Sequence, residues 1–221
     1  MRKILAVVGF FVFVFVFFWG VSIGDYVYAV ELEPIAAMGG ITWTENGIKE
    51  GHKSFVLIGL KANLKVANDS YVSLMAKGWQ MSEPLDEDRE IPRKGYGLSS
   101  EFNHSIKLEK VKFTPYAGFG FEHWSRAEGN SKIANSWTSV RFFTLSIGTR
   151  AEYKRFYAKA GAILPFDINT NSTGLGSKLG YKTEIGADIW KKLNVGLFRE
   201  QVNFKSDTGL ALTGVKFTYR F

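Results

Sequence analysis

Residues 178–190 read Lys-Leu-Gly-Tyr-Lys-Thr-Glu-Ile-Gly-Ala-Asp-Ile-Trp. The odd-numbered positions are mostly apolar and include Leu179, Tyr181 and Ile185, whereas the even-numbered positions up to residue 188 are glycine, lysine, glutamate or aspartate. Successive side chains of a β-strand point to opposite faces of the sheet. The period of two therefore predicts a strand with one apolar face and one polar face.

The same alternation recurs along the chain after residue 30, where no stretch has the i, i+3, i+4, i+7 spacing of a convincing amphipathic helix. Residues 54–66 and 114–124 are two further clear examples. We predict ten strands, at residues 34–45, 54–66, 70–82, 96–108, 112–124, 138–152, 156–167, 178–190, 194–205 and 211–221. Most of these segments have about the length that crosses a bilayer when the strand is tilted.

The connections between the predicted strands alternate in length. Short polar turns are expected at residues 67–69, 109–111, 153–155 and 191–193, and longer links at residues 46–53, 83–95, 125–137, 168–177 and, shortest of these, 206–210. Short periplasmic turns and longer outer loops are typical of outer-membrane barrels. We therefore predict an all-β fold, a transmembrane antiparallel up-and-down β-barrel. A soluble lipocalin-like barrel, with its apolar face inside, is the alternative.

The amino terminus has the pattern of an export signal. Met1-Arg2-Lys3 precedes an apolar run over residues 4–21, and Val27-Tyr28-Ala29 has the small or medium residues of a signal-peptidase site. We predict a signal peptide over residues 1–29 and a barrel domain over residues 30–221. A retained transmembrane anchor is the alternative, because 18 apolar residues can cross a bilayer.

The composition excludes several classes of protein. The chain has 221 residues and no cysteine, which removes disulfide scaffolds, thiolate zinc sites and cysteine nucleophiles. Its formal charge of +7 is dispersed rather than gathered in runs, so no nucleic-acid partner is predicted. The acidic loop at residues 83–94 lacks the spacing of a calcium-binding loop. We predict neither a metal site nor a cofactor.

The carboxy-terminal residues 213–221 place Val215, Phe217, Tyr219 and Phe221 on one face. With Gly214, these aromatic residues resemble the carboxy-terminal signal that the outer-membrane barrel assembly machinery reads. The chain as a whole resembles the small outer-membrane barrels of the opacity-protein and OmpA-like type, and residues 113–120 resemble one of their central strands.

That resemblance implies a monomeric protein in the outer membrane of a Gram-negative bacterium. Its expected partners are outer-membrane lipids, lipopolysaccharide and the barrel assembly machinery. The family mostly has eight strands, so eight is the alternative to our count of ten.

The polar faces of the predicted strands would project many charges into the barrel. The inward positions are expected to be Lys61, Lys65, Lys77, Lys107, Arg150, Lys159, Lys182, Arg199, Lys216 and Arg220, against Glu101, Glu122, Glu152, Glu184 and Asp188. Unpaired buried charge is costly, so we predict a network of ion pairs and hydrogen bonds that largely fills the lumen. The predicted role is structural or surface-interacting. A small porin that uses the positive excess to prefer anions is the alternative.

A lipid-modifying hydrolase is the second alternative. A lipid A deacylase of this shape resembles the chain, and the resemblance places a His-x-Ser pair near the outer end of the penultimate strand. Residues 196–203 there contain neither His nor Ser. His123 and Ser125 form such a pair in the fifth strand, but no carboxylate is spaced to orient the imidazole. We therefore predict no catalytic residues and no enzymatic activity, with His123 a member of the aromatic girdle.

We expect removal of Phe221 to impair assembly, because this residue ends the aromatic pattern that resembles the assembly signal. The measurement is the amount of folded, heat-modifiable barrel in the outer-membrane fraction. Equal amounts of folded barrel with and without Phe221 would contradict this expectation.

Overall fold

The computed structural model describes residues 30–45, 47–81, 94–125, 139–170, 175–205 and 207–221. The predicted signal peptide, the acidic loop up to residue 93 and nearly all of the loop at 125–137 lie outside the described residues, so their predictions stay untested. In the described part of the chain there is no helix of the length and apolar character needed to cross a membrane.

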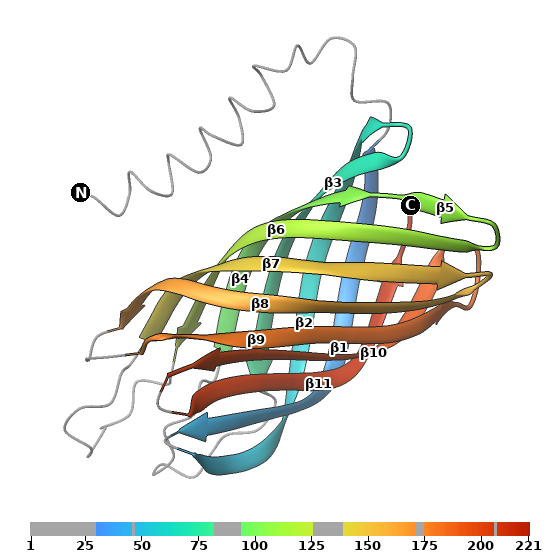
Figure 1. Ribbon diagram of the computed structural model, residues 1–221. Helices are drawn as coiled ribbons and strands as arrows, with labels where there is room; N and C mark the ends of the chain where they lie inside the picture. Colours follow the sequence, from blue (N-terminus) through green and yellow to red (C-terminus); the bar gives the residue numbers. More distant parts are fainter. Residues whose placement is uncertain (1–29, 46, 82–93, 126–138, 171–174, 206) are drawn as a thin grey trace.

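The described residues form eleven strands. They are β1 (Val30–Glu45), β2 (Ile48–Ala67), β3 (Ser70–Met81), β4 (Lys94–His104), β5 (Ile106–Leu108), β6 (Val111–Ser125), β7 (Ser139–Tyr153), β8 (Phe156–Thr170), β9 (Ser177–Asp188), β10 (Leu193–Phe204) and β11 (Thr208–Tyr219). The strands lie in the order β4-β3-β2-β1-β11-β10-β9-β8-β7-β6-β5, and β4 also pairs with β6. This last pairing closes the sheet into a barrel (Figure 1).

The strands β4 and β5 make up a single member of the barrel wall. Both pair with β6, and Ser105 interrupts them where its backbone N–H donates to the carbonyl of Asp69 over 2.6 Å. The Ser105 hydroxyl lies 3.3 Å from that of Thr114 inside the barrel. The wall therefore has ten antiparallel members, which confirms the predicted count and corrects the alternative of eight.

The period of two places the apolar faces outside. In β9, Leu179 and Ile185 are 61% and 59% exposed, whereas the alternating Gly180, Lys182 and Glu184 are buried or half-buried. Ile58 of β2 and Ile147 of β7 are also exposed on the outer surface. This orientation is the one a lipid-facing barrel needs, and it excludes the lipocalin-like alternative, in which the apolar face points inward.

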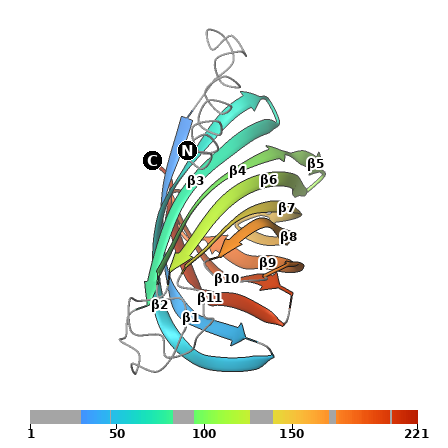
Figure 2. The same cartoon turned by 90° about the vertical axis from the view of Figure 1, so that its left-hand side faces the viewer.

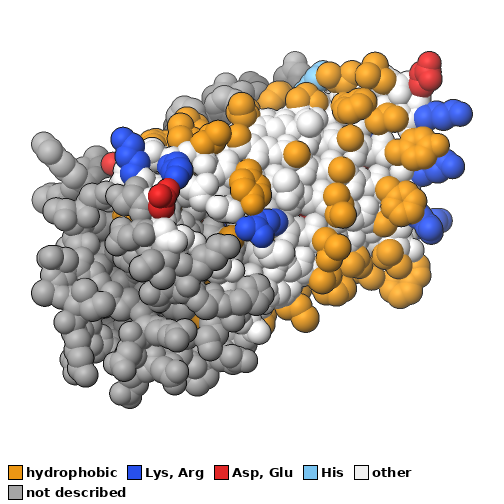
Figure 3. Space-filling model, turned by 60° about the horizontal axis from the view of Figure 1, so that its bottom comes forward, with side chains coloured by type: hydrophobic (Ala, Val, Ile, Leu, Met, Phe, Trp, Pro, Cys, Tyr) orange, Lys and Arg blue, Asp and Glu red, His pale blue; other side chains and the backbone are white. Residues whose placement is uncertain are grey.

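The strands run obliquely along the wall (Figures 1 and 2). Figure 3 shows hydrophobic side chains gathered over the end of the barrel away from the grey loops. The tight-turn end carries exposed aromatic residues at its rim, namely Tyr153, Phe156, Trp190, Tyr219 and Phe221. Aromatic girdles of this kind mark the membrane interface of outer-membrane barrels. This end also holds the carboxy terminus and corresponds to the periplasmic side.

Two of the connections predicted to be longer are short. The strand β2 already begins at Ile48, so only residues 46–47 join it to β1, and Gly47 has a φ of 81°. Residues 205–207 join β10 to β11, with Asp207 at a φ of 47°. Residues at positive φ permit such two- and three-residue hairpins. The strict alternation of short and long connections is therefore wrong at these two places.

The first and last strands meet at a pair of glycines. Gly39 lies opposite Gly214 in the β1–β11 register. A Cβ atom on Gly214 would lie 2.2 Å from the carbonyl oxygen of Met38, and one on Gly39 would lie 2.0 Å from that of Thr213. The two backbones therefore approach each other more closely than any side chain allows. Of the predicted assembly-signal residues, Gly214 faces inward at this seam, whereas Phe217, Tyr219 and Phe221 face outward.

Replacing Gly214 by alanine is expected to destabilise the folded barrel, because the new methyl group would overlap the backbone of β1. Overpacking of this kind costs about 1–3 kcal/mol. The free energy of unfolding in urea, measured by tryptophan fluorescence in lipid vesicles, reports the loss. Gly78→Ala is the matched control, because the nearest atom to its Cβ is 3.8 Å away. Similar losses for the two variants would contradict a tight seam.

Candidate functional site: the barrel interior

The barrel interior has two sections of different chemistry. The section at the loop end is apolar, and the section at the tight-turn end is charged. The apolar section consists of Ile41, Trp43, Phe55, Trp79, Met81, Trp124, Val140, Phe142, Val202, Phe204, Leu210 and Leu212, which we call the aromatic cap. Every one of these side chains is buried.

Edge-to-face contacts hold the aromatic cap together. The ring centroids of Trp124 and Phe142 are 4.7 Å apart, and those of Phe142 and Phe204 are 5.4 Å apart, both nearly perpendicular. Trp79 meets Trp124 at 6.4 Å in the same manner. Such pairs stabilise a core beyond the area that they bury. Strands from both halves of the chain are thereby joined across the lumen.

The first charged layer lies directly beneath the cap. The Lys77 ammonium is 3.0 Å from Glu122 Oε1 and 2.8 Å from Glu200 Oε1, so one cation bridges two carboxylates from opposite sides of the wall. Trp124 Nε1 donates to Glu122 Oε2 over 3.4 Å. This tryptophan therefore belongs to both sections of the interior.

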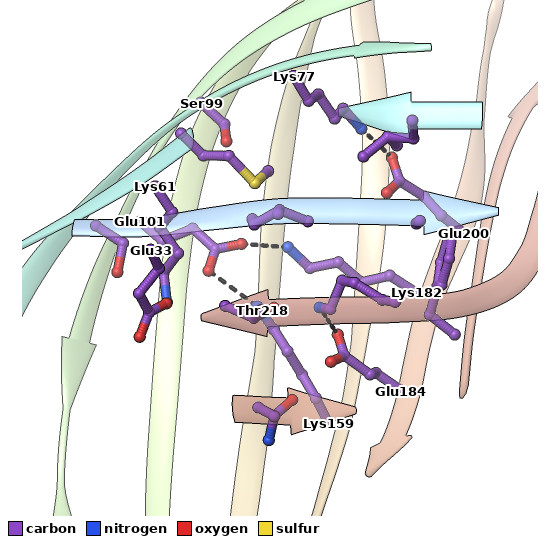
Figure 4. Close-up of a pocket in the computed structure, with 18 of the residues that line it drawn as sticks. Glu33, Lys61, Lys77, Ser99, Glu101, Lys159, Lys182, Glu184, Glu200 and Thr218 are labelled. Carbon is purple, nitrogen blue, oxygen red and sulfur yellow. Dashed lines mark hydrogen bonds and ion pairs between the residues drawn. The ribbon is translucent and has the colours of Figure 1, made fainter. Parts of the chain in front are cut away.

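A second layer is organised around Glu101. Its two carboxylate oxygens accept hydrogen bonds from Lys159, over 3.0 Å, and from Lys182 (Figure 4). Both ammonium groups also lie over the ring of Tyr116, at 4.2 Å and 4.6 Å from its centroid. The carboxylate and the aromatic ring together compensate two adjacent positive charges.

A third group of contacts surrounds Glu184. This carboxylate accepts hydrogen bonds from the Lys216 ammonium and from the Tyr157 hydroxyl. The same hydroxyl lies 2.9 Å from Asn194 Oδ1, and Asn194 Nδ2 donates to Asp188 over 3.1 Å. A cavity of about 160 Å³ remains between these layers, lined by Lys77, Glu101, Lys182, Glu184, Glu200 and their neighbours. Several of the side chains that line this cavity are paired with one another.

Further ion pairs occupy the tight-turn end. Glu33 is 3.0 Å from Lys61 and 3.3 Å from Arg220, and Arg220 is 3.4 Å from Asp188. On the other side of the mouth, Glu152 pairs with Arg150 over 2.7 Å and with Lys112 over 3.2 Å. The ion pairs thus continue from the aromatic cap to the periplasmic rim.

The charges in these interior ion pairs nearly balance. The described residues contribute the cations Lys61, Lys77, Lys112, Arg150, Lys159, Lys182, Lys216 and Arg220, and the anions Glu33, Glu101, Glu122, Glu152, Glu184, Asp188 and Glu200. The positive excess predicted from the sequence is therefore too large. Sequence reasoning missed Glu33, Glu200 and Lys112.

Three predicted interior cations lie elsewhere. Arg199 is exposed on the outer face, because its neighbour Glu200 takes the inward position of the alternation. The Arg199 guanidinium donates a hydrogen bond to Gln201 and lies 6.0 Å from the ring centroid of Tyr181 on β9. Lys65 and Lys107 are exposed at the periplasmic mouth and make no ion pair within the described part of the chain.

The His123 and Ser125 side chains also lie on the outer face of β6, since the inward Glu122 and Trp124 alternate with them. The His123 ring stacks on Tyr96 with centroids 4.8 Å apart, and its Nδ1 accepts a hydrogen bond from Arg141 Nε over 3.2 Å. No carboxylate among the described residues makes a hydrogen bond or ion pair with this imidazole. Nor do the described residues contain a group of three His, Asp or Glu side chains that could hold a metal ion.

We expect Lys77→Met to destabilise the barrel strongly, because Glu122 and Glu200 would be left facing each other without a cation. Breaking a buried ion pair by removing one partner costs about 3–5 kcal/mol. Urea unfolding in lipid vesicles measures the change. The triple variant K77M/E122Q/E200Q removes all three charges and should recover much of the loss. Equal stability of the single variant and the wild type would show that the ion pairs of Lys77 do not stabilise the barrel.

Comparison with known proteins finds similar structures but no matching sequences: no family model and no curated protein matches the chain. Neisserial surface protein A has 10% identity and a TM-score of 0.42, with 87% of this chain and 97% of that chain covered. Ail, the attachment invasion locus protein of Yersinia pestis, has 11% identity and a TM-score of 0.34, with 86% and 98% covered.

The outer-membrane phospholipase A of Escherichia coli has 11% identity and a TM-score of 0.38, with 88% of this chain and 93% of that chain covered. The closed ten-stranded wall, its apolar outer face and its polar interior give this chain the architecture of a small outer-membrane β-barrel of the Gram-negative cell envelope.

Proposed function

We propose that this protein is a sealed, non-enzymatic outer-membrane barrel whose role is structural or surface-interacting. The observation that carries the proposal is the aromatic cap, in which buried rings from strands on both sides of the barrel meet across the lumen. A barrel of this size has an interior little wider than its own side chains. The cap leaves the loop end without a polar path.

The chemistry of the cap opposes ion passage. Trp79, Trp124 and Phe142 lie where a conducting barrel would need polar groups, and apolar constrictions exclude water and ions. Beneath them, the Lys77 ammonium lies in contact with two carboxylates. An ion entering from the periplasm would have to separate these pairs and then cross an apolar section.

The balance of interior charge argues against the anion-preferring porin. Selectivity for anions needs a surplus of cations that face the path. Here the described interior cations are matched almost one for one by carboxylates, and Arg199 lies on the outer surface. The interior is accordingly better suited to hold the wall together than to attract a solute.

The geometry around His123 supports the absence of hydrolase activity. The imidazole lies next to the Arg141 guanidinium, which disfavours a second positive charge on the ring. A general base in a Ser–His pair has to take up such a charge, and a carboxylate normally orients and stabilises it. The stacking on Tyr96 fits a residue of the aromatic girdle.

In planar-bilayer recordings, we expect the purified full-length protein to give no steady conductance. Removing part of the cap by Phe142→Ala together with Phe204→Ala should produce measurable openings, because these two rings are in contact at the centre of the cap. Leu145→Ala is the matched control, since Leu145 is 50% exposed on the outer face. Large, steady, anion-selective steps from the wild-type protein would overturn the proposal.

A further inference from the structure

In the half of the barrel nearer the loops, the outward positions of β10, β11 and β1 are polar or small, whereas the other half of the same strands exposes apolar side chains such as Met38, Leu197 and Phe217. The outward positions in the half nearer the loops are Arg199, Gln201 and Asn203 of β10, Gly209, Ala211 and Thr213 of β11, and Gly40, Thr42 and Thr44 of β1, which we call the polar sector. Figure 3 shows this face with few hydrophobic side chains between the apolar end and the grey loops. On β8, by contrast, the corresponding half carries Leu164 and Phe166.

The polar sector lies partly at the depth of the hydrocarbon. Arg199 is six residues from Leu193, the first residue of β10 above the periplasmic aromatic rim. At the rise and tilt of barrel strands, six residues correspond to about 15 Å of height, within an apolar band of about 25 Å. An arginine facing acyl chains at this depth is destabilising. A polar occupant of the sector would compensate this cost.

The polar sector contains a groove. Its volume is about 440 Å³, and its lining includes Thr42, Arg199, Gln201, Asn203, Ala211 and Thr213. The small side chain of Ala211 lies between Gln201 on one neighbouring strand and Thr42 on the other, because these residues are its register partners. The wall is thus hollowed along β11, with carboxamide, guanidinium and hydroxyl groups on the sides.

The hydrogen bonds within the groove form a continuous row. Arg199 Nη2 donates to Gln201 Oε1 over 3.3 Å, and Gln201 Nε2 donates to Asn203 Oδ1 over 2.9 Å. Asn203 Nδ2 donates to the carbonyl oxygen of Leu179 over 2.8 Å. The row fixes the orientation of each amide, and N–H groups of the Arg199 guanidinium remain without a hydrogen bond to any described residue.

The charge of the groove is positive at its deep end and neutral at its rim. Arg199 makes no ion pair with any described carboxylate. At the rim, Lys178 and Asp207 neutralise each other over 2.7 Å, and this hydrogen bond holds the pKa of the Asp207 carboxyl below its usual range. An anionic group would complement Arg199, and neutral hydrogen-bonding groups fit the remaining length.

We propose that the groove binds the phosphorylated sugar headgroup of a glycolipid of the outer leaflet, with a phosphate at Arg199 and sugar hydroxyls along Gln201, Asn203 and the threonines. A glycolipid supplies an anion and several hydroxyl groups in one ligand, and its acyl chains continue into the adjacent apolar belt. A second copy of the chain fits less well, because a two-fold contact would bring two positive grooves together. With this site, part of the outer wall would contact a lipid headgroup, whereas the rest of the wall contacts acyl chains.

The test measures lipid binding to the delipidated full-length barrel in detergent, by native mass spectrometry. The probes are lipid A, lipid A without phosphates, and phosphatidylglycerol, which is anionic but carries no sugar. We expect lipid A to bind at least tenfold more tightly than either of the other lipids. Arg199→Leu should lower the lipid A affinity at least tenfold, and Q201L/N203L should lower it further.

Arg141→Leu is the matched control, because Arg141 is an exposed arginine of the outer face on β7 and contacts His123 instead of the groove. It should change the lipid A affinity less than twofold. Each variant is first checked for its heat-modifiable folded band; Arg199→Leu is expected to fold, since it places an apolar side chain on the lipid-facing wall.

Equal binding of lipid A by the wild-type protein and Arg199→Leu would overturn the proposal. Equal binding of phosphatidylglycerol and lipid A would also overturn it, because only a nonspecific anion site would then remain. A mass of two chains that is lost in Arg199→Leu would assign the groove to a second copy and would likewise overturn it.

Discussion

Backbone hydrogen bonding in lipid is the constraint on which the rest of this structure depends. Because a bilayer offers no water to unpaired N–H and C=O groups, a sheet can cross it only when every strand has two neighbours. The pairing of β4 with β6 and of β1 with β11 meets that condition. At the latter seam, Gly39 and Gly214 let the two ends of the wall approach without a side chain between them.

Because the wall closes, the side chains of its inner face are enclosed in a narrow lumen. With ten strands, the lumen is narrow enough to be filled by side chains, and its polar faces bring in charges that need partners. The chain resolves this by two different means. Ion pairs such as those of Glu101 with Lys159 and Lys182 lie in the periplasmic section, whereas edge-to-face rings such as Trp124 and Phe142 lie in the section at the loops.

Most of the fold was predictable because the period of two is read directly from the side chains. In β9 the apolar Leu179, Tyr181 and Ile185 face outward, and Lys182 and Glu184 face inward, as their polarity indicates. Alternation of polar and apolar residues is less informative where two neighbouring residues are both charged. Arg199 and Glu200 are adjacent in β10, so alternation requires one to face outward but does not say which.

The register resolves the choice between Arg199 and Glu200. Phe198, Val202 and Phe204 belong to the aromatic cap or pack against it, which makes the even-numbered face the inner one. Glu33 was not predicted as an inward residue for another reason. The strand β1 begins at Val30, four residues earlier than the alternation suggested. The short hairpin at Gly47 depends on a positive φ, which sequence pattern alone indicates weakly.

The interior charges of the described residues are mostly paired with one another. Inside, each carboxylate in an ion pair is already satisfied by a lysine or arginine of the same chain, as Glu184 is by Lys216. On the outside, polar groups such as Arg141 and Arg199 have hydrogen bonds to His123 and Gln201 but no ion pair with a described carboxylate. The outward position of Arg199 is therefore more informative than any of the buried charges, because the fold explains each of those by an ion-pair partner, whereas it supplies no carboxylate for Arg199 among the described residues.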